Sequence, residues 1–234
     1  MDSMQGLIYV TLDISDWDNL PPSYVVEKAT AKLGVGEVTG ATGAFVYFAT
    51  DAAAAGAGKP QWLVMWESSD IDHDTTAGPR DAREQDSGTA YHQDLFALQS
   101  TYTSPSFTSA ELQAGSATNY IVAVVIRLDE AFKEEYDRYY AEEHIGGLME
   151  VPGWRRTRRY VEAGRSGEGD AERSKGEVKI LQLHDYDPDG YGVGGEEFKR
   201  ATSTEWYRRM MEKAVVGKDR RTYELCGYVS LRES

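Results

Sequence analysis

The sequence of 234 residues predicts an α+β fold: two tandem β-α-β-β-α-β halves, packed sheet to sheet as an α/β barrel within one chain. Three observations predict this fold. The strand and helix patterns of the first half restart in the second half, and short motifs recur at a nearly constant spacing. In addition, a four-stranded antiparallel sheet in this order carries its helices on one face only, and a second sheet can cover the other face.

Each element of the first half has a local signal. Residues 7–14 alternate apolar with polar side chains and are rich in β-branched residues, which predicts a strand. A Pro-Pro turn leads to Ser23, a favoured helix N-cap. Short apolar runs predict further strands, and the acidic segment 70–88 predicts a loop. The predicted elements are strand 7–14, helix 23–33, strands 44–49 and 62–66, helix 91–100 and strand 106–112.

The second half restarts the pattern after residue 116. An aromatic stripe at helical spacing predicts its first helix, which Gly146 and Gly147 are expected to end in a left-handed cap. Pro152-Gly153 predicts a turn, and the Gly/Ser/charged segment 164–176 predicts a loop. The predicted elements are strand 120–128, helix 130–145, strands 154–161 and 178–184, helix 196–214 and strand 222–231. Each half therefore has the ferredoxin-like order.

A gapped internal repeat relates the two halves. Residues 37–40 match 150–153 at an offset of 113, residues 8–12 match 122–126 at 114, and residues 63–67 match 181–185 at 118. A drift of a few residues is what loop insertions produce, so the three ordered matches predict a duplication. The predicted halves are residues 1–116 and 117–234, with a boundary near 113–118.

The charge of the chain argues against two classes of partner. A net charge of −14 disfavours nucleic acid and anionic membranes, because both repel an acidic surface. The charge is uneven, at −11 for residues 1–116 and −3 for residues 117–234, so the second half has most of the cations that an anionic ligand would need. A homodimer is compatible with the sequence and is left open.

The remaining bulk features predict a cytoplasmic protein. The single cysteine, Cys226, excludes an internal disulfide framework and fits a reducing compartment. The first five residues have no basic region followed by an apolar run, and no segment approaches 18 consecutive apolar residues. We therefore expect neither a signal peptide nor a transmembrane helix.

Strand alternation sorts side chains between two faces. We expect the apolar set of each first strand to face the helices, together with Leu63, Met65, Leu181 and Leu183 of the third strands. The opposite set, expected to line the barrel interior, combines large aromatics with polar groups, which predicts a small-molecule pocket. Its members are Tyr9, Asp13, Trp62, Trp66, Arg127, Gln182 and His184. The alternative is that Asp13 and Arg127 lie in solvent at strand ends and the tryptophans only fill space.

The helix predicted over residues 130–145 carries the main catalytic candidate. Phe132, Tyr136, Tyr139 and Tyr140 form an aromatic stripe, and His144 lies on its flank. Imidazole titrates near neutral pH, so His144 is a candidate general acid/base, while the alternative is a structural histidine. The neighbouring Glu143 and the end of the helix favour its protonated form, and burial opposes both.

Other candidates surround this helix. His184 and Tyr140 are expected to orient the substrate, and Arg127 or Arg158 to hold an anionic group. For Arg158 the alternative is an ordinary structural ion pair. No histidine or cysteine pair has metal-ligand spacing, so we predict no metal site. A G-x-S-x-G nucleophile elbow is also absent.

One motif resembles a known family. The run Phe132-x3-Tyr136-x2-Tyr139-Tyr140-x2-Glu143-His144, followed by Val-Pro-Gly-Trp and an arginine-rich strand, resembles the EthD-type branch of the dimeric α/β-barrel superfamily. Residues 117–234 carry the resemblance. In the first half Thr30 and Ala31 occupy the positions of Glu143 and His144, which implies one histidine-bearing helix per chain.

The resemblance implies several activities, because members include polyketide cyclases, decarboxylases, lactone isomerases, cofactor-free oxygenases and heme enzymes. We expect a cofactor-independent enzyme that performs cyclisation or decarboxylation on an aromatic or polyketide-like small molecule. A close variant is cofactor-free oxygenation of a hydroxyaromatic. The alternative from another class is a non-catalytic ligand-binding or stress-type barrel, with heme on His184 or His144 as an option within it.

Overall fold

The computed structural model describes residues 5–14, 20–33, 41–51, 61–68, 89–108, 119–163, 176–187 and 192–230. The strands are β1 (Gly6–Ile14), β2 (Ala41–Ala49), β3 (Trp62–Ser68), β4 (Thr89–Thr103), β5 (Tyr120–Asp129), β6 (Trp154–Glu162), β7 (Glu177–Tyr186) and β8 (Val215–Ser230). The helices are α1 (Pro22–Leu33), η1 (Glu130–Phe132), α3 (Lys133–Tyr139), η2 (Tyr140–His144), α4 (Ile145–Met149), α5 (Glu196–Ala201) and α6 (Glu205–Lys213). Of these described helices, none is long and apolar enough to cross a bilayer.

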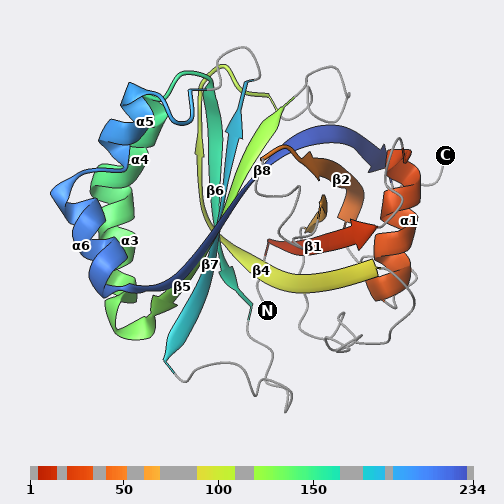
Figure 1. Cartoon of the computed structure of the whole chain (residues 1–234), viewed down its shortest axis with the longest axis horizontal. Coiled ribbons are helices and arrows are strands. Elements are labelled where there is room, and N and C mark those ends of the chain that lie inside the picture. The colour runs from red at the N-terminus through yellow and green to blue at the C-terminus, as the bar shows by residue number, and fades with distance from the viewer. Residues whose placement is uncertain are drawn as a thin grey trace.

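The strands close into one antiparallel barrel in the order β1-β3-β2-β8-β5-β7-β6-β4. Each half contributes its strands in the ferredoxin-like order, fourth-first-third-second, and the pairs β2–β8 and β4–β6 join the halves. Helices α3 to α6 cover the barrel on one side and α1 lies on the opposite side (Figure 1). The α+β barrel predicted from the sequence is therefore confirmed, while its predicted boundary near residues 113–118 lies outside the described residues.

The pairing registers of the two halves correspond. Ile8 lies opposite Trp66 in the first half, and Val122 lies opposite His184 in the second. Likewise Tyr47 lies opposite Leu63, and Tyr160 lies opposite Leu181. The offsets of 114, 118 and 113 found in the sequence repeat therefore carry each pair of the first half onto a pair of the second.

The prediction of a helix over residues 91–100 is wrong, because this segment belongs to strand β4. Phe96 packs inside the barrel and its neighbour Leu95 packs under α1, so successive residues point to opposite faces. Since both faces of this strand are covered, its apolar run lacks a clean alternation and imitates a buried helix. The predicted strand 106–112 is also absent over its described part, residues 106–108.

The helical boundaries differ from the prediction for a packing reason. Gly146 and Gly147 do not cap the helix but lie inside α4. A Cβ on Gly147 would come within 2.9 Å of the Ala201 Cβ, so glycine permits α4 to approach α5 closely. The chain then turns at Gly153, where φ is 78°. The single helix predicted over 196–214 is two helices, and β8 begins at Val215 rather than at residue 222.

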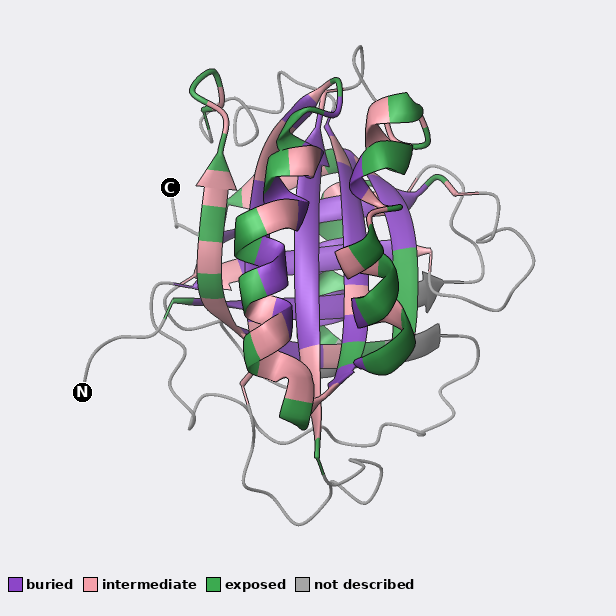
Figure 2. Ribbon diagram, turned by 90° about the vertical axis from the view of Figure 1, so that its left-hand side faces the viewer, coloured by how far each residue is buried: buried purple, intermediate pink, exposed green. Residues whose placement is uncertain are grey.

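The predicted helix-facing sets of the first strands are confirmed for residues 8, 10 and 12 and for residues 122, 124, 126 and 128, but the predicted faces of the third strands are wrong. Leu63, Met65, Leu181 and Leu183 pack inside the barrel with Tyr9. Trp62, Trp66, Gln182 and His184 instead occupy the outer faces of β3 and β7, under the helices. Residues directly opposite each other in an antiparallel pair share a face, so Trp66 must follow Ile8 and His184 must follow Val122. Figure 2 shows the buried strands behind the helices of the second half.

A buried ionic cluster lies at one end of the barrel interior. The Asp185 carboxylate accepts hydrogen bonds from Arg156 (3.0 Å), Arg158 (3.2 Å) and Asn119 (3.0 Å), and Arg158 also pairs with Glu67. Burial raises the pKa of Asp185, but the two guanidinium groups outweigh burial and hold that pKa below its usual range. The cluster therefore requires an ionised carboxylate.

We expect Asp185→Asn to lower the free energy of unfolding by about 3–5 kcal/mol, because it leaves a buried guanidinium without its carboxylate. Urea unfolding at pH 7 measures this loss. Since the folded pKa is depressed, the contribution is present above about pH 4 and disappears as the pH falls through the folded value.

The matched control is Asp187→Asn, which breaks the ion pair of Arg155 with a carboxylate that is 41% exposed. Such a pair contributes about 0–1 kcal/mol. Equal losses in the two variants would contradict a structural role for the buried cluster.

Candidate functional site

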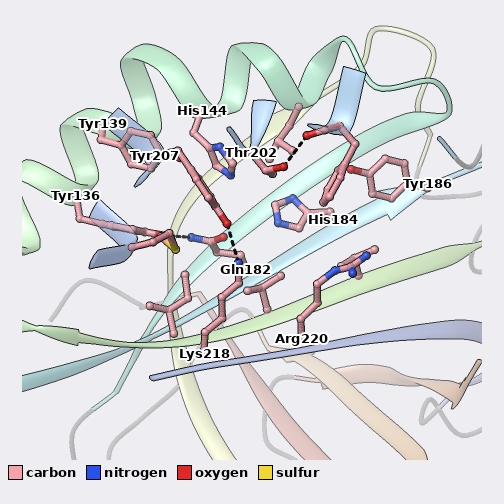
Figure 3. Close-up of a pocket in the computed structure, with 16 residues that line it drawn as sticks. Tyr136, Tyr139, His144, Gln182, His184, Tyr186, Thr202, Tyr207, Lys218 and Arg220 are labelled. Carbon is pink, nitrogen blue, oxygen red and sulfur yellow. Dashed lines mark hydrogen bonds between the residues drawn. The ribbon is translucent and has the colours of Figure 1, made fainter. Parts of the chain in front are cut away.

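A small cavity of about 40 Å³ lies between the helices of the second half and the outer faces of β5, β7 and β8 (Figure 3). Its floor is apolar, and its polar groups are His144, Gln182, His184, Lys218 and Arg220 with several hydroxyls. The lining residues are Val122, Val124, Ile126, Tyr136, Tyr139, His144, Leu148, Gln182, His184, Tyr186, Phe198, Thr202, Tyr207, Met211, Lys218 and Arg220. The barrel closes its interior with packed side chains, so the candidate site lies outside the barrel.

A π-helical turn places the first histidine. Over η2 the amide of Ile145 bonds to the Tyr140 carbonyl, one residue further back than in an α-helix. The aromatic stripe predicted from the sequence is buried as expected, with Tyr136, Tyr139 and Tyr140 all inaccessible to solvent. The widened turn brings His144 to the end of this stripe, where its side chain extends from the helix toward the sheet (Figure 3).

The hydrogen bond of His144 fixes its tautomer. Its Nδ1 lies 3.2 Å from the carbonyl oxygen of Ala201. A carbonyl only accepts, so Nδ1 carries the proton and donates it. The neutral ring therefore has an unprotonated Nε2. Tyr139 and Tyr207 stack against the imidazole with ring centroids 5.3 and 5.8 Å away, which holds the ring plane in place.

His184 on β7 has the opposite tautomer. The hydroxyl of Thr157 lies 2.9 Å from its Nδ1 and also accepts the indole N–H of Trp154 at 2.9 Å. Thr157 is fully buried, so its hydroxyl hydrogen needs an acceptor within the protein. Among the described residues, Nδ1 of His184 is in position to accept it. Nδ1 of His184 therefore accepts and Nε2 carries the proton. The cavity thus has one imidazole that accepts and one that donates.

Burial keeps both imidazoles neutral. It lowers the pKa of His144 to about 4, against the opposing effect of the hydrogen bond to Ala201. It lowers the pKa of His184 to about 3, with His144 acting in the same direction. Of the opposing effects expected for His144, burial dominates. Glu143 does not face the ring, because its carboxylate accepts a hydrogen bond from Thr204, the N-cap of α6, at 2.5 Å.

Further polar groups surround the two rings. The Gln182 amide donates to the Tyr136 hydroxyl at 2.8 Å, which fixes the side chain on the cavity wall. Two exposed cations of β8 line the same cavity: Lys218 donates to the Tyr207 hydroxyl at 3.2 Å, and the Arg220 guanidinium lies 5.5 Å from the Phe198 ring. None of the lining residues is an aspartate or a glutamate.

Of the residues predicted for the site, the structure brings together three: His144, His184 and Gln182. Tyr140 lies beside them, with its ring centroid 5.3 Å from that of His144 and the Arg159 guanidinium 4.1 Å from its own. It does not line the cavity.

The other predicted site residues lie elsewhere, because they were placed in a barrel pocket that the core fills. Tyr9 packs against Phe96 inside the barrel. Trp62 and Trp66 lie under α1, and Arg158 belongs to the buried ionic cluster. Arg127 is exposed and faces Glu177 at 3.9 Å. The side chain of Asp13 lies outside the described residues.

The sequence interpretation missed Tyr207, Lys218 and Arg220. The last strand was expected to begin at residue 222, which left the two cations in a connection. Lys218 and Arg220 alternate along β8 opposite Ile126 and Val124, whose outer face was predicted correctly. A longer last strand would have placed them on that face.

No protein-family model and no curated protein sequence matches the chain. Solved structures of similar fold are an anthrone oxidase-like protein (TM-score 0.61, 15% identity, 97% of this chain and 94% of that one) and a putative monooxygenase from Fusobacterium nucleatum subsp. nucleatum (0.56, 12%, 100% and 98%). A chlorite dismutase from Candidatus Nitrospira defluvii, in complex with imidazole, is also similar (0.51, 14%, 96% and 92%). At these identities the similarity shows the fold alone, an α/β barrel shared over nearly the whole chain, and the resemblance to the EthD-type branch is not confirmed.

We expect long-range ¹⁵N correlation spectra at pH 7 to show both histidines neutral, His144 as the Nδ1–H tautomer and His184 as the Nε2–H tautomer. His144→Gln and His184→Gln assign the signals. Two identical tautomers, or a charged ring, would contradict the hydrogen-bond assignment.

The same burial makes stability depend on pH. Between about pH 6.5 and pH 4 the unfolded chain protonates both histidines while the folded rings stay neutral, so the free energy of unfolding decreases as the pH falls. Burial of His144 alone corresponds to a decrease of about 3 kcal/mol over this window. Urea unfolding at pH 7 and pH 5 measures about 2 kcal/mol of this decrease, the part that falls above pH 5, and His144→Gln should reduce it.

Proposed function

We propose that this protein is an enzyme that removes a proton from a hydroxyaromatic compound and oxidises the resulting carbanion with dioxygen, using no bound cofactor. The observation that carries the proposal is the pair of buried neutral imidazoles, one accepting and one donating, that face one cavity. Proton removal next to a carbonyl needs a base and a donor for the developing enolate oxygen, in a site that excludes water.

The reaction balances without another oxidant. Nε2 of His144 takes a proton from an activated CH₂ group, and the Nε2–H of His184 donates to the oxygen on which the negative charge develops. The carbanion transfers an electron to dioxygen, and recombination forms a C–O bond. Loss of the second C–H proton and cleavage of the O–O bond then give a ketone and water, so that R₂CH₂ and O₂ become R₂C=O and H₂O.

The shared fold supports this choice among acid/base reactions. Two of the similar structures are described as a putative monooxygenase and an anthrone oxidase-like protein. Both cover nearly the whole of this chain, so their architecture can hold such chemistry. In an anthrone the carbonyl acidifies the CH₂ group on the opposite side of the central ring, because the carbanion is conjugated through both aromatic rings to the carbonyl oxygen. This acidity reduces the demand on a base whose pKa burial has lowered.

The cavity is too small to hold an aromatic substrate unless side chains move. A volume of about 40 Å³ holds a few waters or dioxygen, whereas pockets for aromatic ligands occupy about 300 Å³ or more. Substrate binding therefore requires displacement of the side chains over the cavity. These come from α5, its C-cap Thr202 and α6: Phe198, Thr202, Tyr207 and Met211. A porphyrin is larger than such a substrate and would require a larger displacement, so the cavity does not favour the heme alternative.

A second candidate uses the same groups without oxygen. Cyclisation by aldol closure, or decarboxylation, also needs a base and a donor to an enolate oxygen, and the paired tautomers of His144 and His184 meet that need equally. Consumption of dioxygen separates the two reactions.

We also propose that the halves 1–116 and 117–234 arose by duplication, with one site per chain. The corresponding strand registers support this relation. Trp66 occupies the position equivalent to His184 and is fully buried, so the first half lacks the imidazole pair.

We expect the protein to accelerate oxygen uptake by 1,8-dihydroxyanthrone above its spontaneous rate, with matching quinone formation and no Soret band in the protein spectrum. His144→Gln should lower the turnover about a hundredfold or more, the usual contribution of one general base. The control is His92→Gln, which changes an exposed histidine of β4 and should leave the rate unchanged.

Three other outcomes reject the proposal in different ways. Product formation without oxygen uptake favours cyclisation or decarboxylation. Saturable binding without turnover favours a ligand-binding protein. Equal rates for the wild type and His144→Gln would remove the imidazole mechanism.

A further inference from the structure

The cavity differs in charge from the rest of the chain. The protein has 39 acidic and 25 basic residues, yet the cavity lining contains two cations, Lys218 and Arg220, and no carboxylate. Both cations come from β8 and are exposed to solvent, and they lie on the sheet side of the cavity, across from the helix that carries His144 (Figure 3). The mouth of the site is therefore positive on an acidic protein.

These two cations lack the carboxylate partners that the four arginines of β6 have. Arg155, Arg156, Arg158 and Arg159 of β6 each contact a carboxylate. Among the described residues, Lys218 has its hydrogen bond and ring contact with Tyr207, Arg220 has a ring contact with Phe198, and neither forms an ion pair. Each therefore retains hydrogen-bond donors for a ligand.

The strand geometry lets both cations act on one group. Residues 218 and 220 are two apart on β8 and lie on the same face, opposite Ile126 and Val124 of the cavity floor. Alternate residues of a strand are about 7 Å apart, a separation that long side chains can close around a single carboxylate or phenolate. The aromatic faces of Phe198 and Tyr207 adjoin the same position.

The cations also act on the histidines. Lys218 depresses the pKa of His144, and Arg220 and Lys218 depress that of His184, in both cases after the larger effect of burial. An anion between the two cations would offset this field and make both imidazoles more basic. A charged substrate would thereby improve the base that acts on it.

We propose that the cavity binds aromatic compounds carrying an anionic group, a carboxylate or a phenolate, which Lys218 and Arg220 hold at its mouth. The proposal deepens the proposed function, on which it rests for the reacting end of the substrate. It assigns to these two residues the role first expected of Arg127 or Arg158.

The test compares 3-hydroxy-2-naphthoate with its neutral methyl ester by isothermal titration calorimetry at pH 7. We expect the acid to bind the wild type at least tenfold more tightly than the ester, with an affinity that decreases between 50 and 500 mM NaCl. In Lys218→Met/Arg220→Met the acid should lose this advantage and its salt dependence, while the affinity for the ester stays unchanged. Circular dichroism and a thermal melt establish that the variant is folded.

Arg127→Met is the matched control, because Arg127 is an exposed cation of β5 outside the cavity. It should bind both probes like the wild type. Equal binding of acid and ester by the wild type, equal losses for both probes in the double variant, or no binding of either probe at millimolar concentration would overturn the proposal. Selective binding of the acid without oxygen uptake by any substrate would instead overturn the proposed oxidation and leave the anion site standing.

Discussion

The register between neighbouring strands is the constraint on which this structure depends. Closure through β2–β8 and β4–β6 encloses one face of every strand and fills it with packed side chains. Only the outer faces remain for a site, and the helices must cover them. Because His184 lies opposite Val122, the register places it on the outer face of β7, below the helix that carries His144. A shift of one residue would move His184 into the barrel.

The sequence was sufficient for the fold and for part of the site. β3 and β5 were predicted although both of their faces are buried, because they are short, continuous apolar runs rich in aromatic or β-branched residues. β4 was mistaken for a helix, because its two buried faces leave no clean alternation around Leu95 and Phe96 and its ends are polar. Alternation divides the residues of a strand into two sets but does not say which set faces the core, and only pairing with a neighbour does. For that reason His184 and Gln182 were assigned to the wrong face, yet they still join His144, since that helix covers the face on which they lie.

The two histidines show how a hydrogen bond to a buried ring sets which of its nitrogens donates and which accepts. Both rings form a hydrogen bond through Nδ1. In His144 this nitrogen donates to the carbonyl of Ala201, whereas in His184 it accepts from the hydroxyl of Thr157. Two side chains of one type therefore leave the same atom, Nε2, in different states: as an acceptor in His144 and as an N–H donor in His184. Holding them neutral costs stability in acid, and that cost is characteristic of sites that keep ionisable groups away from water. The ionic cluster around Asp185, inside the barrel, meets the same problem by pairing its charges.

The close contact of Gly147 with Ala201 links the position of α5 to the state of His144. Ala201 ends α5, a helix whose Phe198 covers the cavity, and its carbonyl oxygen is also the acceptor that keeps the proton on Nδ1 of His144. The tautomer of His144 therefore depends on the position of α5, because the acceptor for its Nδ1–H is the last residue of that helix. The same short helix thus covers the cavity and sets the donor and acceptor pattern of one of its rings.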